Sequence, residues 1–312
     1  MPVIEVDDLR KRYGDVTAVD GVGFHVEAGE VYALLGENGA GKSTTVEILE
    51  GHRERTSGSA SVLGVDPGRA GREFHDRIGV VLQSAGIESE FSVREVIELY
   101  ASAYRRPRPL AEVVELVGLD DEVDRRVGSL SGGQKRRVDL ALGIVGRPEV
   151  LFLDEPTTGF DPAARRRSWD LVEALGADGT TILLTTHYLD EAEHLADRVG
   201  VLRRGRLVAE GPPASLIEGI SGTTVAFALP ESIDPADATA TLGAALGVDV
   251  RVSGRHVEAN VEQPTAVVHR ATGWALERGI ELEGLTVSRA SLEDVFLQLT
   301  DDGADTTGGV PR

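Results

Sequence analysis

Gly36-Glu37-Asn38-Gly39-Ala40-Gly41-Lys42-Ser43-Thr44 is the stretch of this 312-residue chain that decides its fold. It fits the pattern G-x-x-x-x-G-K-[ST], in which a glycine-rich turn surrounds phosphate groups. The apolar run from Val31 to Leu35 precedes it and predicts a buried strand. The amphipathic run from Thr45 to Glu50 follows and predicts a helix, which Gly51 is placed to end. Strand, glycine-rich turn and helix form the context that the pattern requires.

The residue types in this turn suit a polyphosphate ligand. Gly36, Gly39 and Gly41 allow the backbone to approach an anion closely, and the N–H groups that follow can converge on it at a helix N-terminus. Lys42 adds a positive charge for the β- and γ-phosphates, and the Ser43 hydroxyl can bind Mg²⁺. We therefore predict that the chain binds a nucleoside triphosphate. A chance match in an ordinary turn is the alternative, and the flanking elements argue against it.

The composition excludes several classes of protein. Hydrophobic residues make up 41% of the chain, enough to bury a sizeable core, and the length favours two domains. No apolar run approaches the ~18–20 residues needed to cross a bilayer, and the first residues lack the apolar core of an export signal. The chain has no cysteine, which excludes disulfides and thiolate sites. A formal charge of −20 disfavours attraction to nucleic acid or anionic lipid.

Two weaker signals lie on either side of the glycine-rich turn. Residues 3 to 7 and 22 to 27 alternate apolar and polar and predict antiparallel strands, with Tyr13 between them. An exposed aromatic at this place can stack on a purine, although an ordinary edge-strand tyrosine fits the same pattern. The second signal is Gln83, which follows a predicted strand at 78 to 82. A glutamine there can reach a metal ion or a water molecule, but alone it carries little weight.

A helical segment from Ser92 to about Gly128 interrupts the alternation of strands and helices. It begins with a capping box, Ser92 to Glu95, after which Val96, Leu99 and Tyr100 recur at helical spacing, and a second helix is expected at 110 to 117. This pattern predicts a small helical insert in an α/β domain.

A second helix N-terminus with anion-binding character follows in Leu130-Ser131-Gly132-Gly133-Gln134. Ser131 and Gln134 have the spacing of a capping box, so the helix begins here with two glycines in its first turn. Glycine is costly in a helix unless something must approach the backbone closely. We therefore interpret the stretch as a second anion site at the positive end of a helix dipole. An ordinary capped helix is the alternative.

Two carboxylates end the next buried strand. The run Val150-Leu151-Phe152-Leu153 predicts a strand inside a parallel sheet, and Asp154 and Glu155 follow at the edge where α/β proteins bind ligands. Asp154 can hold Mg²⁺, and Glu155 can orient or deprotonate a water molecule that attacks a γ-phosphate. An acidic helix N-cap is the alternative. His187 follows another buried strand, which starts at Thr181, and can contact the γ-phosphate.

Taken together, these motifs resemble the nucleotide-binding subunits of ABC (ATP-binding cassette) transporters over roughly residues 3 to 220, in matching order and spacing. The resemblance assigns Walker A to 36–44, the LSGGQ signature to 130–134 and Walker B to 150–154. The site residues that it implies are Tyr13, Gly36, Glu37, Asn38, Gly39, Ala40, Gly41, Lys42, Ser43, Thr44 and Gln83 for the nucleotide; Ser43, Gln83 and Asp154 for Mg²⁺; Glu155, His187 and Lys42 for hydrolysis; Ser131, Gly132, Gly133 and Gln134 for ATP on a partner subunit; and Asp161 for the D-loop.

The resemblance also implies a fold, ligands and partners. The expected fold is an α/β P-loop NTPase with an antiparallel β subdomain and a helical subdomain at about 86–145. ATP and Mg²⁺ are the expected ligands, in a homodimer where the Walker A turn of one subunit and the signature of the other share one ATP. A separate transmembrane permease, a cytoplasmic position at the inner face of the cell membrane and no nucleic acid are expected. Glu37 and Phe160 replace the usual proline and leucine, and neither position supplies an essential ligand.

Residues 221 to 300 depart from the cassette pattern. Their predicted elements follow the order β-α-β-β-α-β, which favours a small ferredoxin-like α+β domain, with Asp234 as the N-cap of its first helix. Ser291 to Thr300 predicts a final amphipathic helix, and the composition of 301–312 predicts disorder. This tail resembles that of ATPase subunits of daunorubicin-resistance-type drug and antibiotic exporters.

Other hypotheses deserve a comparison with export. A soluble ABC ATPase of translation or DNA repair is disfavoured by the single cassette, the short insert and the acidic balance. A regulatory cassette without turnover is disfavoured by the intact Glu155 and His187. Within export, a lipid or polysaccharide is the alternative to a drug or other hydrophobic compound, because the permease is expected to select the cargo.

Overall fold

The computed structural model describes residues 2–82, 86, 89–218, 222–231, 233, 235–289 and 291–300. The predicted Gln83, the Asp234 cap and the predicted disordered tail lie outside the described residues. The chain divides into two compact units, Met1–Pro213 and Ala214–Arg312. None of the helices in the described part combines the length and the apolar character of a membrane span.

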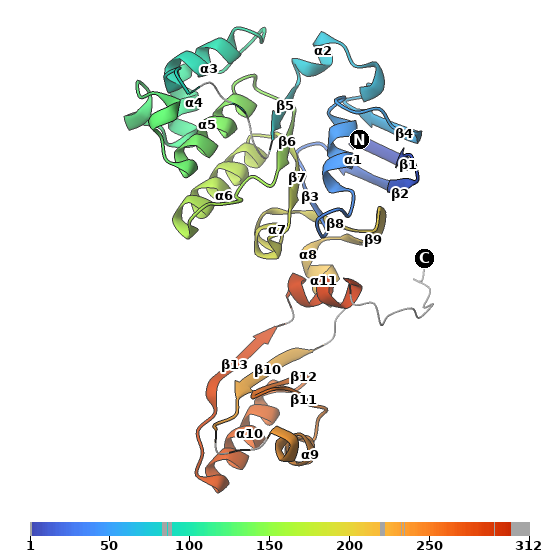
Figure 1. The fold of residues 1–312 in the computed structure, drawn as a ribbon, viewed down its shortest axis with the longest axis vertical. Helices are drawn as coiled ribbons and strands as arrows, with labels where there is room; N and C mark the ends of the chain where they lie inside the picture. Colours follow the sequence, from blue (N-terminus) through green and yellow to red (C-terminus); the bar gives the residue numbers. More distant parts are fainter. Residues whose placement is uncertain are drawn as a thin grey trace. The chain divides into compact units, whose positions relative to one another are not determined.

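A six-stranded sheet forms the centre of the first unit (Figure 1). Its order is β5-β6-β7-β3-β8-β9, and every neighbouring pair is parallel except β8 with β9. All residues of β3 and β7 are buried, as expected for a parallel sheet that is covered on both faces. The strands are β3 (Val31–Leu35), β5 (Ile78–Val81), β6 (Val150–Asp154), β7 (Thr181–Thr186), β8 (Arg198–Arg203) and β9 (Arg206–Gly211).

The parallel arrangement brings the carboxyl ends of these strands to one edge of the sheet. The glycine-rich turn follows β3, Asp154 ends β6 with Glu155 directly after it, and His187 follows β7. The order β6-β7-β3 therefore places the predicted site residues on neighbouring strands, where open α/β sheets bind ligands.

A three-stranded antiparallel sheet, β2-β1-β4, completes the predicted β subdomain. Tyr13 is the last residue of β1, whereas the apolar alternation predicted a strand that ended at residue 7. The difference arises because register shifts between β1 and β2 break the alternation without ending the pairing. The Phe24 ring of β2 stacks on Tyr32 of the central sheet at 5.0 Å, so the two sheets share a core. The strands are β1 (Pro2–Tyr13), β2 (Val16–Glu27) and β4 (Ser57–Val62).

The helical insert contains the two predicted helices. The buried face of the first one differs from the prediction. Ser92 and Glu95 form the expected reciprocal capping box at the start of α3. The buried face of α3 consists of Val93, Val96 and Ile97, whereas Leu99 and Tyr100 are 54% and 44% exposed. The helices of the first unit are α1 (Lys42–Leu49), α2 (Arg72–His75), α3 (Val93–Ala101), α4 (Leu110–Val117), α5 (Gly132–Ile144), α6 (Pro162–Ala177) and α7 (Leu189–Leu195).

The second unit has the predicted β-α-β-β-α-β order, with the sheet order β11-β12-β10-β13. All of its strand pairs are antiparallel, and Phe227 and Trp274 lie in the core between sheet and helices. This topology confirms the ferredoxin-like expectation. The elements are β10 (Thr223–Ala228), α9 (Pro235–Leu246), β11 (Arg251–Ser253), β12 (His256–Val261), α10 (Pro264–Arg278), β13 (Glu283–Arg289) and α11 (Leu292–Thr300), after a short α8 (Pro213–Glu218) that the sequence did not predict.

Candidate active site

The glycine-rich turn forms an anion-binding helix N-terminus. Its last glycine, Gly41, is the N-cap of α1 and has φ 106°, a left-handed conformation that glycine adopts without strain. A Cβ at Gly41 would lie 2.5 Å from the carbonyl oxygen of Ala18, so a larger residue would also clash. No side chain caps α1, which leaves its first N–H groups for another acceptor. This cradle fits a phosphate group.

Lys42 is held inside the turn. Its Nζ donates to the carbonyl oxygens of Gly36 at 2.6 Å and Glu37 at 3.3 Å, and the residue is only 5% exposed. Burial lowers the pKa of Lys42, while the charges of Glu155 and Asp154 act in the opposite direction. An ammonium group has three donors, so the two carbonyls leave one for a phosphate oxygen.

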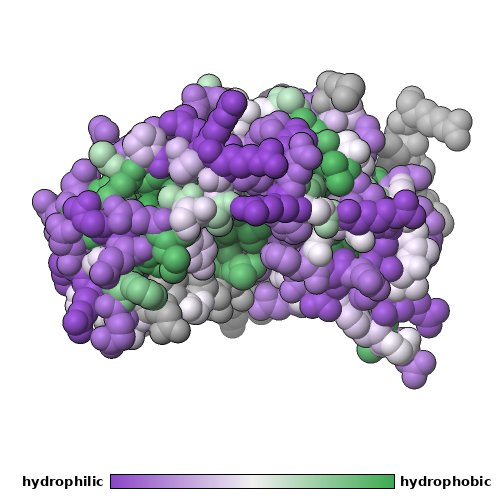
Figure 2. Space-filling view, turned by 90° about the horizontal axis from the view of Figure 1, so that it is seen from above, coloured by the Kyte–Doolittle hydropathy of each residue, from purple (hydrophilic) through white to green (hydrophobic). Residues whose placement is uncertain are grey.

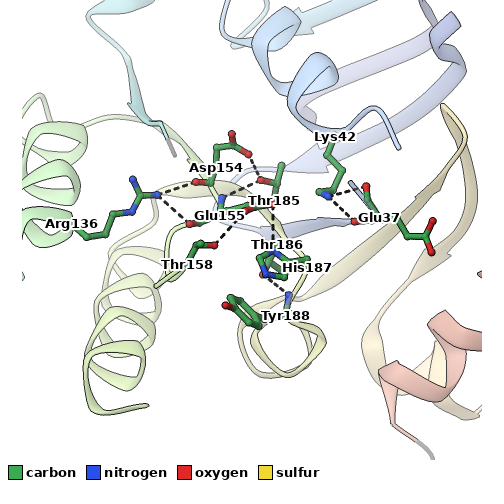
Figure 3. Close-up of polar contacts among 11 residues, drawn as sticks. Glu37, Lys42, Arg136, Asp154, Glu155, Thr158, Thr185, Thr186, His187 and Tyr188 are labelled. Atoms are coloured by element: carbon green, nitrogen blue, oxygen red, sulfur yellow. Dashed lines mark hydrogen bonds and ion pairs between the residues drawn. The ribbon is translucent and has the colours of Figure 1, made fainter. Parts of the chain in front are cut away.

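Asp154 and Glu155 are oriented by the neighbouring strand β7 (Figure 3). The Thr185 hydroxyl donates to Oδ1 of Asp154, and the Glu155 N–H donates to the carbonyl oxygen of Thr185 at 3.0 Å. Glu155 has φ 47°, a left-handed conformation that is unusual for a residue with a side chain. This turn directs the Glu155 carboxylate towards the end of β7.

The carboxylate of Glu155 meets His187 and Thr158. Oε1 lies 3.3 Å from Nδ1 of His187, and Oε2 accepts a hydrogen bond from the Thr158 hydroxyl at 3.3 Å. His187 packs against the ring of Tyr188 with centroids 4.2 Å apart, and its side chain is 40% exposed. A carboxylate paired with a half-exposed imidazole can position and deprotonate a water molecule.

The signature forms a helix N-terminus with a capping box, as predicted. Gln134 N–H donates to the Ser131 hydroxyl at 3.3 Å, and the Ser131 N–H donates to Oε1 of Gln134 at 2.9 Å. Within the described part of the chain, a Cβ added at Gly132 or Gly133 would meet no heavy atom within 4 Å. The fold of the subunit itself therefore does not require glycine at either position.

Tyr13 and Asp161 are two further predicted site residues, and each has local contacts within the subunit. The Tyr13 ring is 40% exposed, with Lys11 Nζ at 5.0 Å and the Arg53 guanidinium at 5.3 Å from its centroid. Asp161 is the N-cap of α6, and its Oδ1 accepts from the N–H groups of Ala163 at 2.9 Å and Ala164 at 2.8 Å. In the subunit as described, Asp161 stabilises the start of that helix.

Two oxygen donors of the kind that Mg²⁺ prefers lie among the predicted site residues. Ser43 is exposed at the start of α1, and Asp154 is oriented by Thr185, so both supply hard oxygen donors. Within the described residues, no group of three or more histidine, cysteine or acidic side chains could hold a metal ion. Mg²⁺ commonly uses one or two protein oxygens with phosphates and water, so these residues suffice.

Sequence reasoning missed Thr185, Thr158 and Arg136. The two threonines lie near predicted site residues. Their position next to the carboxylates was the only signal that could have identified them. Arg136 is 7% exposed and donates to backbone carbonyls around Glu155, a contact that helix periodicity does not predict.

Comparisons with known proteins agree with this geometry. The family model described as "ABC transporter" matches residues 19–158, and "ABC transporter domain-containing protein-like, C-terminal domain" matches 223–291. The chain is 40% identical over 307 residues to "Daunorubicin resistance ATP-binding protein DrrA3" of Streptomyces coeruleorubidus, covering 96% of each chain. It is 39% identical over 302 residues to "Nod factor export ATP-binding protein I" of Burkholderia thailandensis, covering 95% of this chain and 96% of the relative.

Solved structures give the same result for the fold. "Structure of ATP binding subunit of ABC transporter" matches with a TM-score of 0.64 and 28% identity, over 70% of this chain and 92% of that one. "Structure of cbiO1 from clostridium perfringens: Part of the ABC transporter complex cbiONQ" matches with a TM-score of 0.62 and 30% identity, over 70% and 91%. The predicted fold class and family resemblance are thus confirmed. Subunits of this family bind and hydrolyse ATP and work with transmembrane partners. The chain belongs to the ABC transporter family, as one of its ATP-binding subunits.

Proposed function

We propose that this protein hydrolyses MgATP as a homodimer and so drives export of a drug, antibiotic or other hydrophobic compound through a separate permease. The cassette would span residues 3–220 and the accessory domain 221–300. Relatives of nearly equal identity are named for daunorubicin resistance and for Nod factor export. Both names support export, and they make a Nod factor-like compound the second candidate cargo.

The observation that carries the proposal is the meeting of Glu155 and His187, within electrostatic reach of Lys42. The carboxylate and the imidazole lie 3.3 Å apart at adjacent strand ends, and the charge of Glu155 acts on the buried ammonium of Lys42. In the proposed mechanism, the turn at 36–44 binds the phosphates through backbone N–H groups and Lys42. Glu155 orients and deprotonates the attacking water, and His187 contacts the γ-phosphate.

Ser43 and Asp154 are the proposed magnesium ligands, with Gln83 as a third from outside the described residues. Mg²⁺ held there would offset the negative charge of the phosphate oxygens. Thr185 would keep the Asp154 carboxylate in one orientation through its hydrogen bond. Tyr13 would stack on the adenine, since its ring is partly exposed at the end of β1.

A second copy of the subunit would complete each site. Ser131 to Gln134 of the partner copy would present their N–H groups and the Ser131 hydroxyl to the γ-phosphate. The open space around Gly132 and Gly133 supports this, because the subunit's own fold does not explain two glycines there. Asp161 would lie near the dimer contact as the D-loop residue. Loss of the γ-phosphate contact would open the dimer.

Exposed apolar side chains near α3 support docking of a permease. Leu82, just after β5, is 43% exposed, Phe91, just before α3, is 39% exposed, and Leu99 and Tyr100 on α3 are 54% and 44% exposed. Figure 2 looks onto this end of the molecule and shows green apolar residues between purple ones over its left half, where α3 lies. The permease would bring the subunit to the cytoplasmic face of the membrane. Exposed apolar surface commonly binds partner proteins when it is contiguous.

The test is the substitution Glu155→Gln in the full chain. The variant should bind MgATP with unchanged affinity, turn over about 10²–10⁴ times more slowly, and accumulate as a dimer in MgATP. Size-exclusion chromatography with light scattering and a phosphate-release assay measure these results. Equal turnover in variant and wild type would remove Glu155 from its role. If the variant stays monomeric in MgATP, both alone and together with the permease, the result would contradict the shared site.

A further inference from the structure

Arg136 of the signature helix is buried among backbone carbonyls instead of pointing to solvent. It is 7% exposed and lies in the first turns of α5, just after the signature. Its Nε donates to the carbonyl oxygen of Pro156 at 3.1 Å, and its Nη2 donates to those of Asp154 at 2.9 Å and Glu155 at 3.2 Å. Its Nη1 donates to the carbonyl oxygen of Leu82.

Three of these acceptors belong to the turn that carries Glu155. The turn includes the left-handed backbone of Glu155, a conformation that side-chain-bearing residues adopt only at a cost and that surrounding contacts must maintain. The guanidinium binds the carbonyl side of the turn, while the carboxylate of Glu155 meets His187 and Thr158 (Figure 3). Arg136 thus binds the backbone of Glu155, and its charge also acts on the carboxylates of Asp154 and Glu155.

The fourth acceptor connects the same guanidinium to the end of β5. Leu82 directly precedes Gln83, and its side chain is one of the exposed apolar ones named above. Further along α5, the helix lies tightly against β5, since a Cβ added at Gly79 would lie 2.1 Å from the carbonyl oxygen of Gly143. The helix that begins with the signature is therefore joined to two places, the end of β5 and the turn at Glu155.

We propose that Arg136 is a positioning residue that holds the backbone of Glu155 in its hydrolytic conformation and couples it to the signature helix and to the end of β5. This inference rests on the proposed role of Glu155. When the signature helix moves on closing of the dimer, Arg136 moves the carbonyls of residues 154 to 156 with it. Full turnover then requires the signature helix to be in its closed-dimer position, as well as bound nucleotide.

The chemistry of the side chain explains why arginine suits this place. A guanidinium carries five N–H donors in a rigid plane, enough for four carbonyls on different segments. Lysine has three donors on one atom and reaches fewer acceptors at once. The ion pair with Asp139, at 3.6 Å and almost equally buried, keeps the positive charge paired. Removal of Arg136 alone would leave this carboxylate buried without its partner.

Two variants of the full chain separate positioning from folding. Arg136→Lys keeps the charge and the pairing with Asp139, and the double variant Arg136→Gln/Asp139→Asn removes both members of the pair. MgATP affinity and KM should stay within about twofold of wild type, while kcat falls about 10- to 100-fold in the double variant. The kcat of Arg136→Lys should lie between those of wild type and the double variant. Thermal unfolding of each variant records any loss of folded protein.

A matched control lies next in the sequence. Arg137→Gln changes the same residue type on the same helix, where the guanidinium donates to the carbonyl oxygen of Gly118 in the helical insert. Its kcat should equal that of wild type within about twofold, since it does not touch residues 154 to 156. A drop equal to that of the Arg136 variants would mean that any damage to α5 slows turnover, and would overturn the inference.

A double-mutant cycle gives the decisive comparison. If Arg136 acts through Glu155, Arg136→Lys should lower kcat in the wild-type background and change it by less than about twofold in the Glu155→Gln background. Equal losses in both backgrounds, or no loss in either, would overturn the inference and leave the proposed function in place. If Glu155→Gln alone keeps full turnover, the proposed role of Glu155 fails, and this inference fails with it.

Discussion

Oε1 of Glu155 lies 3.3 Å from Nδ1 of His187, at the carboxyl ends of the adjacent parallel strands β6 and β7. The two residues come from separate motifs, and the parallel pairing of Asp154 with Thr185 brings them together. A carboxylate and an imidazole at this distance can act on the same water and phosphate. Their meeting, on which the proposed catalysis depends, is therefore a product of sheet order.

Replacement of His187 by alanine should reduce turnover without loss of nucleotide binding. The variant loses the imidazole beside Glu155, and kcat should fall about 10²-fold or more, in the range of lost acid–base groups. Steady-state phosphate release and fluorescence titration with a nucleotide analogue measure the two quantities. His194→Ala is the control, since His194 pairs with Glu173 on the α6–α7 surface. Matching kcat values for the two variants would contradict the role of His187.

Replacement of Lys42 by alanine should weaken MgATP binding at least tenfold. The variant removes a charge-assisted hydrogen bond to phosphate, worth about 1.5–3 kcal/mol. Isothermal titration of the monomeric protein measures the affinity. Lys135→Ala serves as the control, because Lys135 is exposed and lies outside the glycine-rich turn. Unaltered affinity in Lys42→Ala would count against the assignment of the turn.

Replacement of Gly132 and Gly133 by alanine should spare the subunit and impair the dimer. Each new Cβ enters open space in the subunit, and alanine favours helix, so the melting temperature should stay equal or rise slightly. In the Glu155→Gln background, the MgATP-dependent dimer should weaken by about tenfold or more, since a Cβ obstructs approach of the phosphate. Sedimentation velocity measures the dimer. Gly273→Ala, which also enters open space, is the control, and a dimer of normal stability in the double alanine variant would argue against a shared nucleotide.

Glu50 should make folding stability depend on pH near neutrality. Burial raises the pKa of Glu50 to about 7, and the charges of Asp154 and Glu47 add to this effect. Between pH 4.5 and about 7, the folded state therefore holds a proton that the unfolded state has released. The stability that this proton gives the folded state is complete below about pH 4.5 and is lost as pH rises through 7. In Glu50→Gln, the decrease in unfolding free energy from low to high pH should be smaller than in wild type by up to about 3 kcal/mol. Urea unfolding at pH 5 and pH 8.5 measures it.

The control for this pH effect is Glu54→Gln, which changes an exposed side chain nearby. It should leave the difference in unfolding free energy between the two pH values as in wild type. If Glu50→Gln also leaves this pH difference as in wild type, burial of Glu50 has no energetic consequence and the expectation is wrong.

Charge introduced on the exposed side of α3 should separate the ATPase from its permease. Leu99→Glu/Tyr100→Glu places carboxylates on the exposed side of α3, where desolvation of a charge opposes docking. The isolated variant should keep its ATPase activity, whereas its recovery with a co-expressed permease should fall at least fivefold, as measured by affinity purification. Leu276→Glu changes another exposed leucine, and it should co-purify normally. Normal recovery of the α3 variant would place the permease elsewhere.

Much of the fold could be predicted because it depends on local patterns. The strand Val31–Leu35 and the helix Leu110–Val117 have the predicted limits, and both capping boxes form as expected. The hairpin β1–β2 extends beyond its prediction because bulges disturb the alternation of side chains but not the pairing of the backbones. α1 begins earlier than predicted, at Lys42, because the left-handed Gly41 sets its start and no apolar repeat marks it.

The site was predictable only in part. The motifs and the family resemblance together predicted roles for Lys42, Asp154, Glu155 and His187, and the structure brings Glu155 and His187 within 3.3 Å of each other. The same reasoning did not identify Arg136, because an arginine in an amphipathic helix reads as a solvent-exposed residue. Its acceptors come from residues far away in the sequence.

By itself, the sequence determined which local structures form and which chemical groups they carry, because turns, caps and periodicity depend on neighbouring residues. Only the tertiary structure decided that Glu155 meets His187, that four carbonyls enclose Arg136, and that Glu50 loses its water. Such contacts join segments far apart in the chain. They form only when the order of strands and the packing of helices against the sheet exclude solvent between those segments.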